Sequence, residues 1–163
     1  MKNRRLFLLA GATSLAALAM PVRAEFAGSP QDDLRRAAKL FRDDDDYEGA
    51  TYWAYRGRYR MRALIAARPD TPSKDGEQFL WEFGHETGDM LSKIMLGDIR
   101  KLARILDRVM ADAKSQDDAF TPKAQFAAAH AKALAEIKEI RDGYWKSRWI
   151  IRAERERDGM VNR

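Results

Sequence analysis

The spacing of apolar residues constrains the fold of this chain more than any other sequence feature. Between residues 98 and 113 the apolar positions recur at intervals of three or four: Ile99, Leu102, Ile105, Leu106, Val109 and Met110. This spacing places them on one face of an α-helix, and Gly97 and Asp98 precede it as capping residues. Comparable spacing recurs along most of the chain after residue 29. We therefore predict an all-α fold, a bundle of five or six helices with a long C-terminal helix.

Capping residues indicate where the first and last of these helices begin. Ser29 followed by Pro30 is a typical helix start, so residues 30–42 are predicted to form a short amphipathic helix. Thr121 followed by Pro122 is expected to begin the last helix by the same capping chemistry. This helix is predicted to continue to about residue 157, with a charged end.

Residues 78–95 show a less regular apolar pattern. We predict either two short helices or one helix broken near Gly84 or Gly88. The preceding segment, residues 68–77, consists of turn-forming residues and is predicted to be a loop.

Four consecutive aspartates, Asp43 to Asp46, follow the first predicted helix. Adjacent carboxylates point in different directions, and the run lacks the alternating ligands and the glycine of a calcium-binding loop. We interpret the run as a turn whose negative charge favours the N-terminus of the next helix.

The stretch YWAYRGRYRMR, residues 52–62, fits two structures. As a strand it would place its four arginines on one face, whereas a helix would spread them around its axis. Strong helix formers follow and end before Pro69, so we favour one helix over 47–67 and keep the strand as an alternative. On a helix the arginines form no single line that could follow a phosphate backbone, and we predict no nucleic-acid partner.

The first 24 residues have the pattern of a secretory signal peptide. Lys2, Arg4 and Arg5 precede an apolar run too short to cross a membrane, and small residues lead to a cleavage position after Ala24. Arg4 and Arg5 together resemble a twin-arginine export signal, with an ordinary secretory signal as the alternative. We therefore expect an exported protein, periplasmic or secreted, with one helical domain over 25–163 and no membrane span after signal removal.

Charge and cysteine content narrow the function classes. The chain has 30 basic and 25 acidic residues. Residues 1–24 hold four of the basic residues and no acidic one, so the remainder carries 26 and 25, a net charge of about +1. The chain contains no cysteine. This composition excludes disulfides, thiol nucleophiles, thiolate metal sites and covalent haem attachment through a pair of cysteines.

The string HETGD, residues 85–89, offers a candidate metal site. His85 and Asp89 are four residues apart and would share one helix face beside Glu86, and His130 could approach from the last helix. The second histidine of a zinc-hydrolase helix is absent, and Gly88 is a poor helix residue. A metal-dependent hydrolase using His85, Glu86, Asp89 and His130 is therefore the alternative function, with solvent-facing or core histidines as the simpler explanation.

A carrier of haem or copper is a third hypothesis. Met61, Met90, Met95 and Met110 fall on predicted apolar faces, where methionine ordinarily fills space in a core. Phosphate-binding loops, dinucleotide motifs and nucleophile elbows are absent from the sequence. We predict no cofactor.

Aromatic and basic residues alternate in two places. On the last predicted helix Trp145, Arg148, Trp149 and Arg152 follow helical spacing. Tryptophan with stacked arginine is typical of the residues that dominate protein–protein interfaces. The alternative is that the tryptophans lie in the core and the arginine stems cover them.

The second predicted helix carries a similar mixture. Its candidate binding residues are Trp53, Tyr55, Arg58 and Tyr59. We interpret both sets as candidate partner-binding surfaces.

Four short motifs, YWAYRGRYRMR, LGDI, FTPK and RERDGMVNR, are spread over the chain. With them the chain resembles small secreted or lipid-anchored proteobacterial proteins without an assigned function. The resemblance implies a helical exported protein and identifies no catalytic residue.

These observations lead to one primary hypothesis. We expect an exported protein-binding module whose partner is another exported protein. A specific version is an immunity-type inhibitor that occupies the active site of a secreted toxin, which suits a small charged domain without a recognisable catalytic set.

Overall fold

Side-chain caps set the start of three helices in the computed structural model, which describes residues 25–68 and 74–163. The Ser29 hydroxyl accepts from Asp32 N at 3.2 Å while the Asp32 carboxylate accepts from Ser29 N at 2.9 Å, a reciprocal cap. Asp46 and Asp98 cap later helices by accepting backbone N–H bonds at 2.9 Å. The elements are α1 (Pro30–Asp43), α2 (Tyr47–Ala67), α3 (Lys74–Phe83), η1 (Gly84–Gly88), α4 (Asp89–Met95), α5 (Ile99–Ser115) and α6 (Lys123–Arg157).

These elements confirm the predicted all-α bundle with a long last helix. The predicted signal peptide, residues 1–24, lies outside the described residues. The helix over 47–67 has the predicted limits, which rules out the strand alternative for YWAYRGRYRMR. Within the Asp43–Asp46 run, Asp43 ends α1 and the other three form the expected turn to α2, with Asp46 as the cap of α2.

The break predicted near Gly84 or Gly88 is a π-helical segment, η1, between α3 and α4. It begins at the first glycine and ends at the second. Helical backbone continues on both sides of it, so α3, η1 and α4 follow one another without a loop. A wider π-helical turn of this kind often marks a functional position.

The predicted loop over 68–77 is wrong in its last four residues, because α3 already begins at Lys74. Asp75 and Glu77 lie in the first turn, where negative charge is favourable. Gly76 allows a close approach to α2: a Cβ there would lie 3.2 Å from Met61 Sδ and 3.3 Å from Ile65 Cγ1. Tertiary packing therefore stabilises a helix where the local composition favours a loop.

The predicted start of the last helix also needs correction. Thr121 is fully buried and makes no cap, and α6 begins at Lys123 behind Pro122. The Thr121 carbonyl instead accepts a hydrogen bond from His130 Nε2 at 2.6 Å. Helix α6 continues past Gly143 to Arg157, as predicted, but it is kinked at Phe126, whose φ of −123° and ψ of 35° are not helical.

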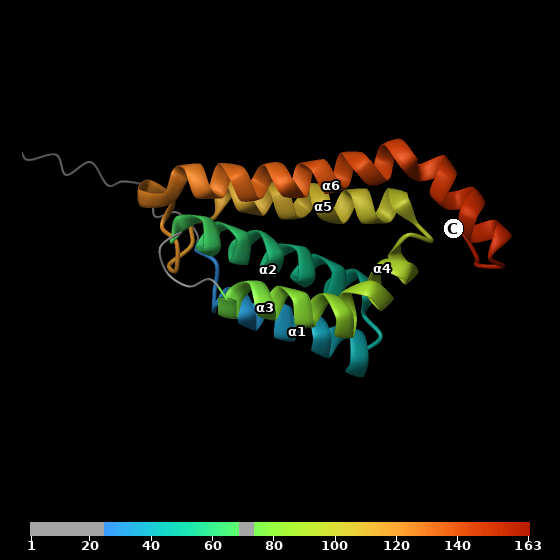
Figure 1. The fold of residues 1–163 in the computed structure, drawn as a ribbon, viewed down its shortest axis with the longest axis horizontal. Helices are drawn as coiled ribbons and strands as arrows, with labels where there is room; N and C mark the ends of the chain where they lie inside the picture. The colour runs from blue at the N-terminus through green and yellow to red at the C-terminus, as the bar shows by residue number, and fades with distance from the viewer. Residues whose placement is uncertain (1–24, 69–73) are drawn as a thin grey trace, which may run out of the picture.

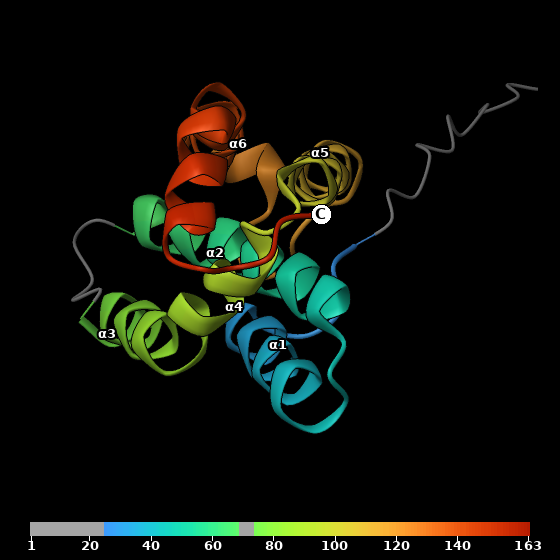
Figure 2. The ribbon, with the colours of Figure 1, turned by 90° about the vertical axis from the view of Figure 1, so that its right-hand side faces the viewer.

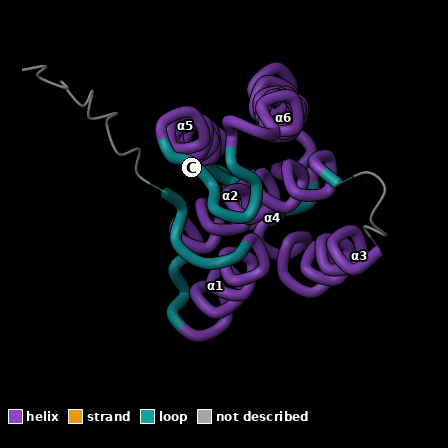
Figure 3. Tube along the Cα trace, turned by 90° about the vertical axis from the view of Figure 1, so that its left-hand side faces the viewer, coloured by secondary structure: helices purple, strands orange, loops and turns teal. Residues whose placement is uncertain are grey.

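Helix α2 runs through the middle of the bundle. Helices α5 and α6 lie side by side on one side of it, and α1 and α3 lie on the other (Figure 1, Figure 2). The end-on tube shows the same arrangement (Figure 3), and α4 lies towards the right-hand end of the bundle in Figure 1. Within the described residues no helix combines the length and the apolar character needed to cross a membrane.

The central position of α2 explains its unusual sequence. Because neighbours surround it, its buried residues occupy more than one face and include Arg56 and Arg60, which are 7% and 0% exposed. The arginines are spread around the helix axis as predicted, but the burial of these two was not predicted. Both guanidinium groups have buried carboxylate partners, from Asp33 on α1 and from Asp118 before α6.

The buried pairs form one chain of charges. Arg56 donates to both oxygens of Asp33, at 2.9 and 2.7 Å, and Arg60 donates to Asp33 Oδ2 at 3.0 Å. Arg60 also donates to Asp118 and to the Gly28 carbonyl at 2.6 Å. Two positive and two negative groups therefore compensate one another, which buried charges require.

The C-terminal segment folds back instead of fraying. Arg155 donates to the carbonyls of Lys93 and Val161 at 2.6 and 3.1 Å, and it is only 9% exposed. Arg163 N donates to Gly97 O at 2.7 Å. These bonds hold residues 158–163, which we call the C-terminal hook, against the connection between α4 and α5.

Candidate functional site

The eight predicted binding residues divide into four environments. Tyr59 belongs to the core: it is 1% exposed, and its hydroxyl lies 2.7 Å from His130 Nδ1. A partner therefore cannot reach it, and its assignment to a binding surface is wrong. Trp53 is half-buried between the guanidinium groups of Arg36 and Arg56, which lie 4.0 and 3.9 Å from its ring centre. This arrangement gives Trp53 a structural role between α1 and α2.

The α6 set reaches the surface together. Trp145 and Trp149 are 37% and 62% exposed. The Arg148 guanidinium carbon lies 4.7 Å from the Trp145 ring centre and 5.2 Å from that of Trp149, so one cation stacks on both rings. Arg148 also donates to the Trp145 carbonyl at 2.7 Å, which holds this geometry. The alternative that these tryptophans lie in the core is therefore wrong.

A groove of about 510 Å³ runs along this set. We call it the Trp–Arg groove. It lies between the C-terminal half of α6 and the start of α5, with the C-terminal hook at its edge. Its lining residues are Leu96, Gly97, Asp98, Ile99, Arg100, Arg104, Trp145, Arg148, Trp149, Arg152, Asn162 and Arg163.

The lining of the Trp–Arg groove is strongly basic. Five of its residues are arginines and one, Asp98, is acidic. The Asp98 carboxylate already accepts the capping bond at the start of α5, and Arg152 pairs with Glu156 at 2.9 Å. The other four arginines form no ion pair with a described residue. Net positive charge therefore collects on one face, although residues 25–163 carry a net charge of only about +1.

Sequence spacing identified the α6 half of this groove but missed the other half. Arg100 and Arg104 on α5 and Arg163 of the hook are far from Trp145 along the chain. Arg100 and Arg104 do share a helix face four residues apart, which was the one available signal. Only the folding of the hook against Gly97 brings Arg163 beside them.

The candidate metal ligands are not brought together. His130 is buried, and both its ring nitrogens contact the protein, Nδ1 with Tyr59 and Nε2 with the Thr121 carbonyl. His85 is exposed and stacks on Trp81 with ring centres 4.1 Å apart. In the described part of the chain no three side chains among His, Asp and Glu form a cluster that could hold a metal ion. The metal-dependent hydrolase therefore has no geometric support.

The four candidate methionines are also dispersed. Met61 and Met95 are core residues, whereas Met90 is 54% exposed. Met110 is half-buried beside the core on α5. The prediction that all four lie on buried faces is therefore wrong for Met90.

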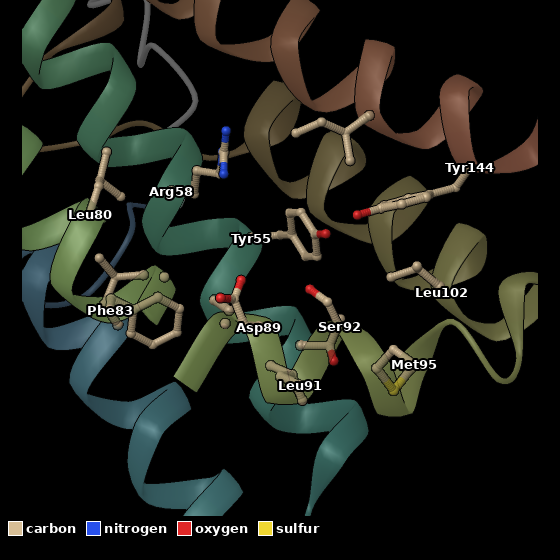
Figure 4. A pocket seen from close by; sticks show the side chains of 16 residues that line it. Tyr55, Arg58, Leu80, Phe83, Asp89, Leu91, Ser92, Met95, Leu102 and Tyr144 are labelled. Atoms are coloured by element: carbon tan, nitrogen blue, oxygen red, sulfur yellow. The ribbon is translucent and has the colours of Figure 1, made fainter. Parts of the chain in front are cut away.

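The remaining two predicted residues, Tyr55 and Arg58, line a separate cavity of about 320 Å³. It lies between α2, α3, α4, α5 and α6, with η1 in its wall. Figure 4 shows the Tyr55 ring inside it, with its hydroxyl directed towards Tyr144 of α6. Burial, and then the charge of Tyr144 and a hydrogen bond with it, raise the pKa of Tyr55 well above its ordinary value. The Tyr55 phenol is therefore a neutral hydrogen-bonding group at neutral pH.

Comparison with protein-family models, curated proteins and solved structures gives no match for this chain.

Proposed function

We propose that this protein is an exported binding module that docks a partner protein through the Trp–Arg groove. One observation carries the proposal: the Arg148 guanidinium stacks on the exposed rings of Trp145 and Trp149 at the border of a basic groove. Exposed tryptophan is costly to leave in water, and tryptophan and arginine dominate the binding energy of protein interfaces.

Charge indicates the chemistry of the partner. Four arginines without an ion-pair partner among the described residues surround the two tryptophans. A partner that presents carboxylates would satisfy them with charge-assisted bonds and would be drawn towards the groove over long range. We therefore propose a partner protein with an acidic, partly aromatic contact face.

An immunity-type inhibitor of a secreted toxin is the specific version of this proposal. The catalytic centre of a toxin that acts on a charged substrate can be blocked by a small domain with a rigid, charged surface. The buried Arg–Asp chain and the long α6 supply rigidity, and the groove supplies the charge. Pre-organisation of this kind lowers the entropic cost of association.

The test begins with recovery of partners from an extract of exported proteins, using tagged residues 25–163 as bait. The partner is then purified and its affinity measured for the wild type and for the Trp145→Ala/Trp149→Ala variant. Trp81→Ala is the matched control, because Trp81 and Trp149 are both 62% exposed while Trp81 lies on α3, outside the groove.

We expect the groove variant to lose at least about thirtyfold in affinity, which corresponds to about 2 kcal/mol, and the control to bind like wild type. The affinity should also fall as salt increases. A partner that binds both variants equally would show that the groove is not the docking surface. A partner with a basic contact face would contradict the charge argument.

A further inference from the structure

The cavity between α2, α3, α4, α5 and α6 has two opposite charges at its opening. Of the residues that line it, only Arg58 and Asp89 are exposed, and the others are buried or half-buried. Arg58 comes from α2 and Asp89 from the first turn of α4. Figure 4 shows the Asp89 carboxylate directed towards α2. One cation and one anion therefore mark the mouth of an otherwise largely apolar cavity.

We propose that this cavity binds a zwitterionic small molecule with an apolar side group, of which a free amino acid with a large apolar side chain is the simplest case. Arg58 binds the carboxylate of the ligand and Asp89 binds its ammonium group. The apolar side group enters the cavity between Phe83, Met95 and Ile140.

The two charges are available to a ligand. Neither Arg58 nor Asp89 forms an ion pair within 4.0 Å with a described residue, although they line the same cavity. Each can therefore form a charge-assisted bond without breaking an existing one. A ligand with only a negative charge would pair with Arg58 but would be repelled by the Asp89 carboxylate. A ligand with only a positive charge would pair with Asp89 but would be repelled by Arg58. Only a ligand that carries both charges satisfies both groups.

The size and polarity of the cavity fit this class of ligand. Its volume of about 320 Å³ lies at the lower end of the range of about 300–1,000 Å³ typical of small-molecule sites. Such sites combine apolar walls with a few polar groups. Here the walls are apolar side chains from α1 to α6, and the inner polar groups include the hydroxyls of Tyr55, Ser92 and Tyr144.

The backbone beside the mouth leaves room for an occupant. Gly84 begins η1 and lines the cavity, and a Cβ placed there would meet no atom within 4 Å. The π-helical turn also places Asp89 directly after η1, at the cavity edge. This inference does not depend on the Trp–Arg groove, which shares no lining residue with the cavity.

Titration calorimetry with three related probes tests the proposal. L-Phenylalanine carries both charges, phenethylamine lacks the carboxylate and 3-phenylpropanoate lacks the ammonium group. We expect saturable one-to-one binding of phenylalanine, or of leucine or methionine if the cavity prefers an aliphatic side chain. The corresponding amine and acid should each bind at least about tenfold more weakly, because each lacks one charge-assisted bond.

Two variants locate the site. Arg58→Gln and Asp89→Asn should each weaken binding of the amino acid at least about tenfold. In addition, Asp89→Asn should narrow the difference between the amino acid and its acid analogue. Arg42→Gln and Glu86→Gln are the controls, since both residues are exposed and neither lines the cavity. Thermal unfolding of each variant establishes that it is folded.

Two results would overturn the proposal. The first is that none of the apolar amino acids binds saturably to the folded wild-type protein. The second is that an amine or an acid binds as tightly as its amino acid, which would remove the zwitterion argument. Unchanged binding by the Trp145→Ala/Trp149→Ala variant would separate this site from the groove.

Discussion

Arg60 donates to both carboxylate oxygens of Asp118, at 2.9 and 3.1 Å, and both side chains are almost completely removed from solvent. The pair joins the middle of α2 to the segment before α6. Because Arg60 also contacts Asp33, it connects three parts of the chain that are far apart in sequence. Charges buried this deeply stabilise a fold only while every partner is present.

Replacement of Arg60 by methionine should therefore destabilise the protein by about 3–5 kcal/mol, since Asp118 would remain charged and unpaired in the core. Chemical denaturation at neutral pH measures this change. Arg62→Met is the control, because Arg62 pairs with the half-exposed Glu77 and should cost at most about 1 kcal/mol. The double variant Arg60→Met/Asp118→Leu should recover part of the loss. Equal effects of Arg60→Met and Arg62→Met would contradict this account.

Helix limits were the most predictable part of the structure. Ser29, Asp46 and Asp98 act through bonds to residues three positions away, so local sequence is enough to identify them. Predictions failed where contacts between residues far apart in the sequence determine the local structure. Gly76 enters α3 because it fits against α2, and Thr121 is buried instead of capping α6.

The candidate sites were predictable only in part, for the same reason. Trp145 and Arg148 share a helix face, and spacing alone places them together. Tyr59 lies in a similar run of aromatic and basic residues but faces the core, because other helices surround α2 on several sides. The cavity was missed altogether: Arg58 and Asp89 come from separate helices, and only the bundle brings them to one opening.

Gly57 marks a close approach of α1 and α2. A Cβ there would lie 2.8 Å from Leu34 Cγ and 3.0 Å from Asp33 Cβ. We expect Gly57→Ala to destabilise the protein by about 1–3 kcal/mol through overpacking, despite the better helix propensity of alanine.

The same substitution at Gly143 is the matched control for Gly57. Gly143 also lies within a helix, but a Cβ there would meet no atom within 4 Å. Gly143→Ala should therefore stabilise the protein by about 0.5–1 kcal/mol. Thermal unfolding at a lower temperature for Gly57→Ala and at a higher temperature for Gly143→Ala would support the packing argument. Stabilisation by both substitutions would refute it.

Stability should fall at alkaline pH because of buried tyrosines. Burial raises the pKa of both Tyr55 and Tyr59 above the ordinary value of about 10, with further contributions from Tyr144 for Tyr55 and from the charges of Asp118 and Asp117 for Tyr59. The folded state then holds these protons more tightly than the unfolded state. This contribution to the free energy of unfolding is fully present below a pH of about 10. It is lost as the pH rises towards the pKa values of the two tyrosines in the folded protein.

Denaturation at increasing pH, together with near-ultraviolet absorbance of phenolate, measures this loss. The free energy of unfolding should decrease above pH of about 10 while these two tyrosines remain protonated in the folded protein. The Tyr55→Phe/Tyr59→Phe variant should show a shallower decrease. Ionisation of every tyrosine near its ordinary pKa in a still folded protein would show that burial does not protect them.

The C-terminal hook gives the last prediction. Arg155 holds it through bonds to Lys93 O, Val161 O and Asn162 Oδ1, and the hook in turn places Asn162 and Arg163 at the edge of the Trp–Arg groove. Arg155→Met removes these bonds, each worth about 0.5–1.5 kcal/mol.

We expect faster hydrogen exchange at the Met160 and Arg163 amides in this variant, because their backbone bonds to Arg155 and Gly97 depend on the closed hook. Exchange in the middle of α2 should not change. Lys138→Met is the control, since Lys138 is exposed on α6 and pairs with Asp142, away from the hook. If exchange of the hook amides stays at its wild-type rate in Arg155→Met, another contact must hold the hook, and the basic edge of the groove would not depend on Arg155.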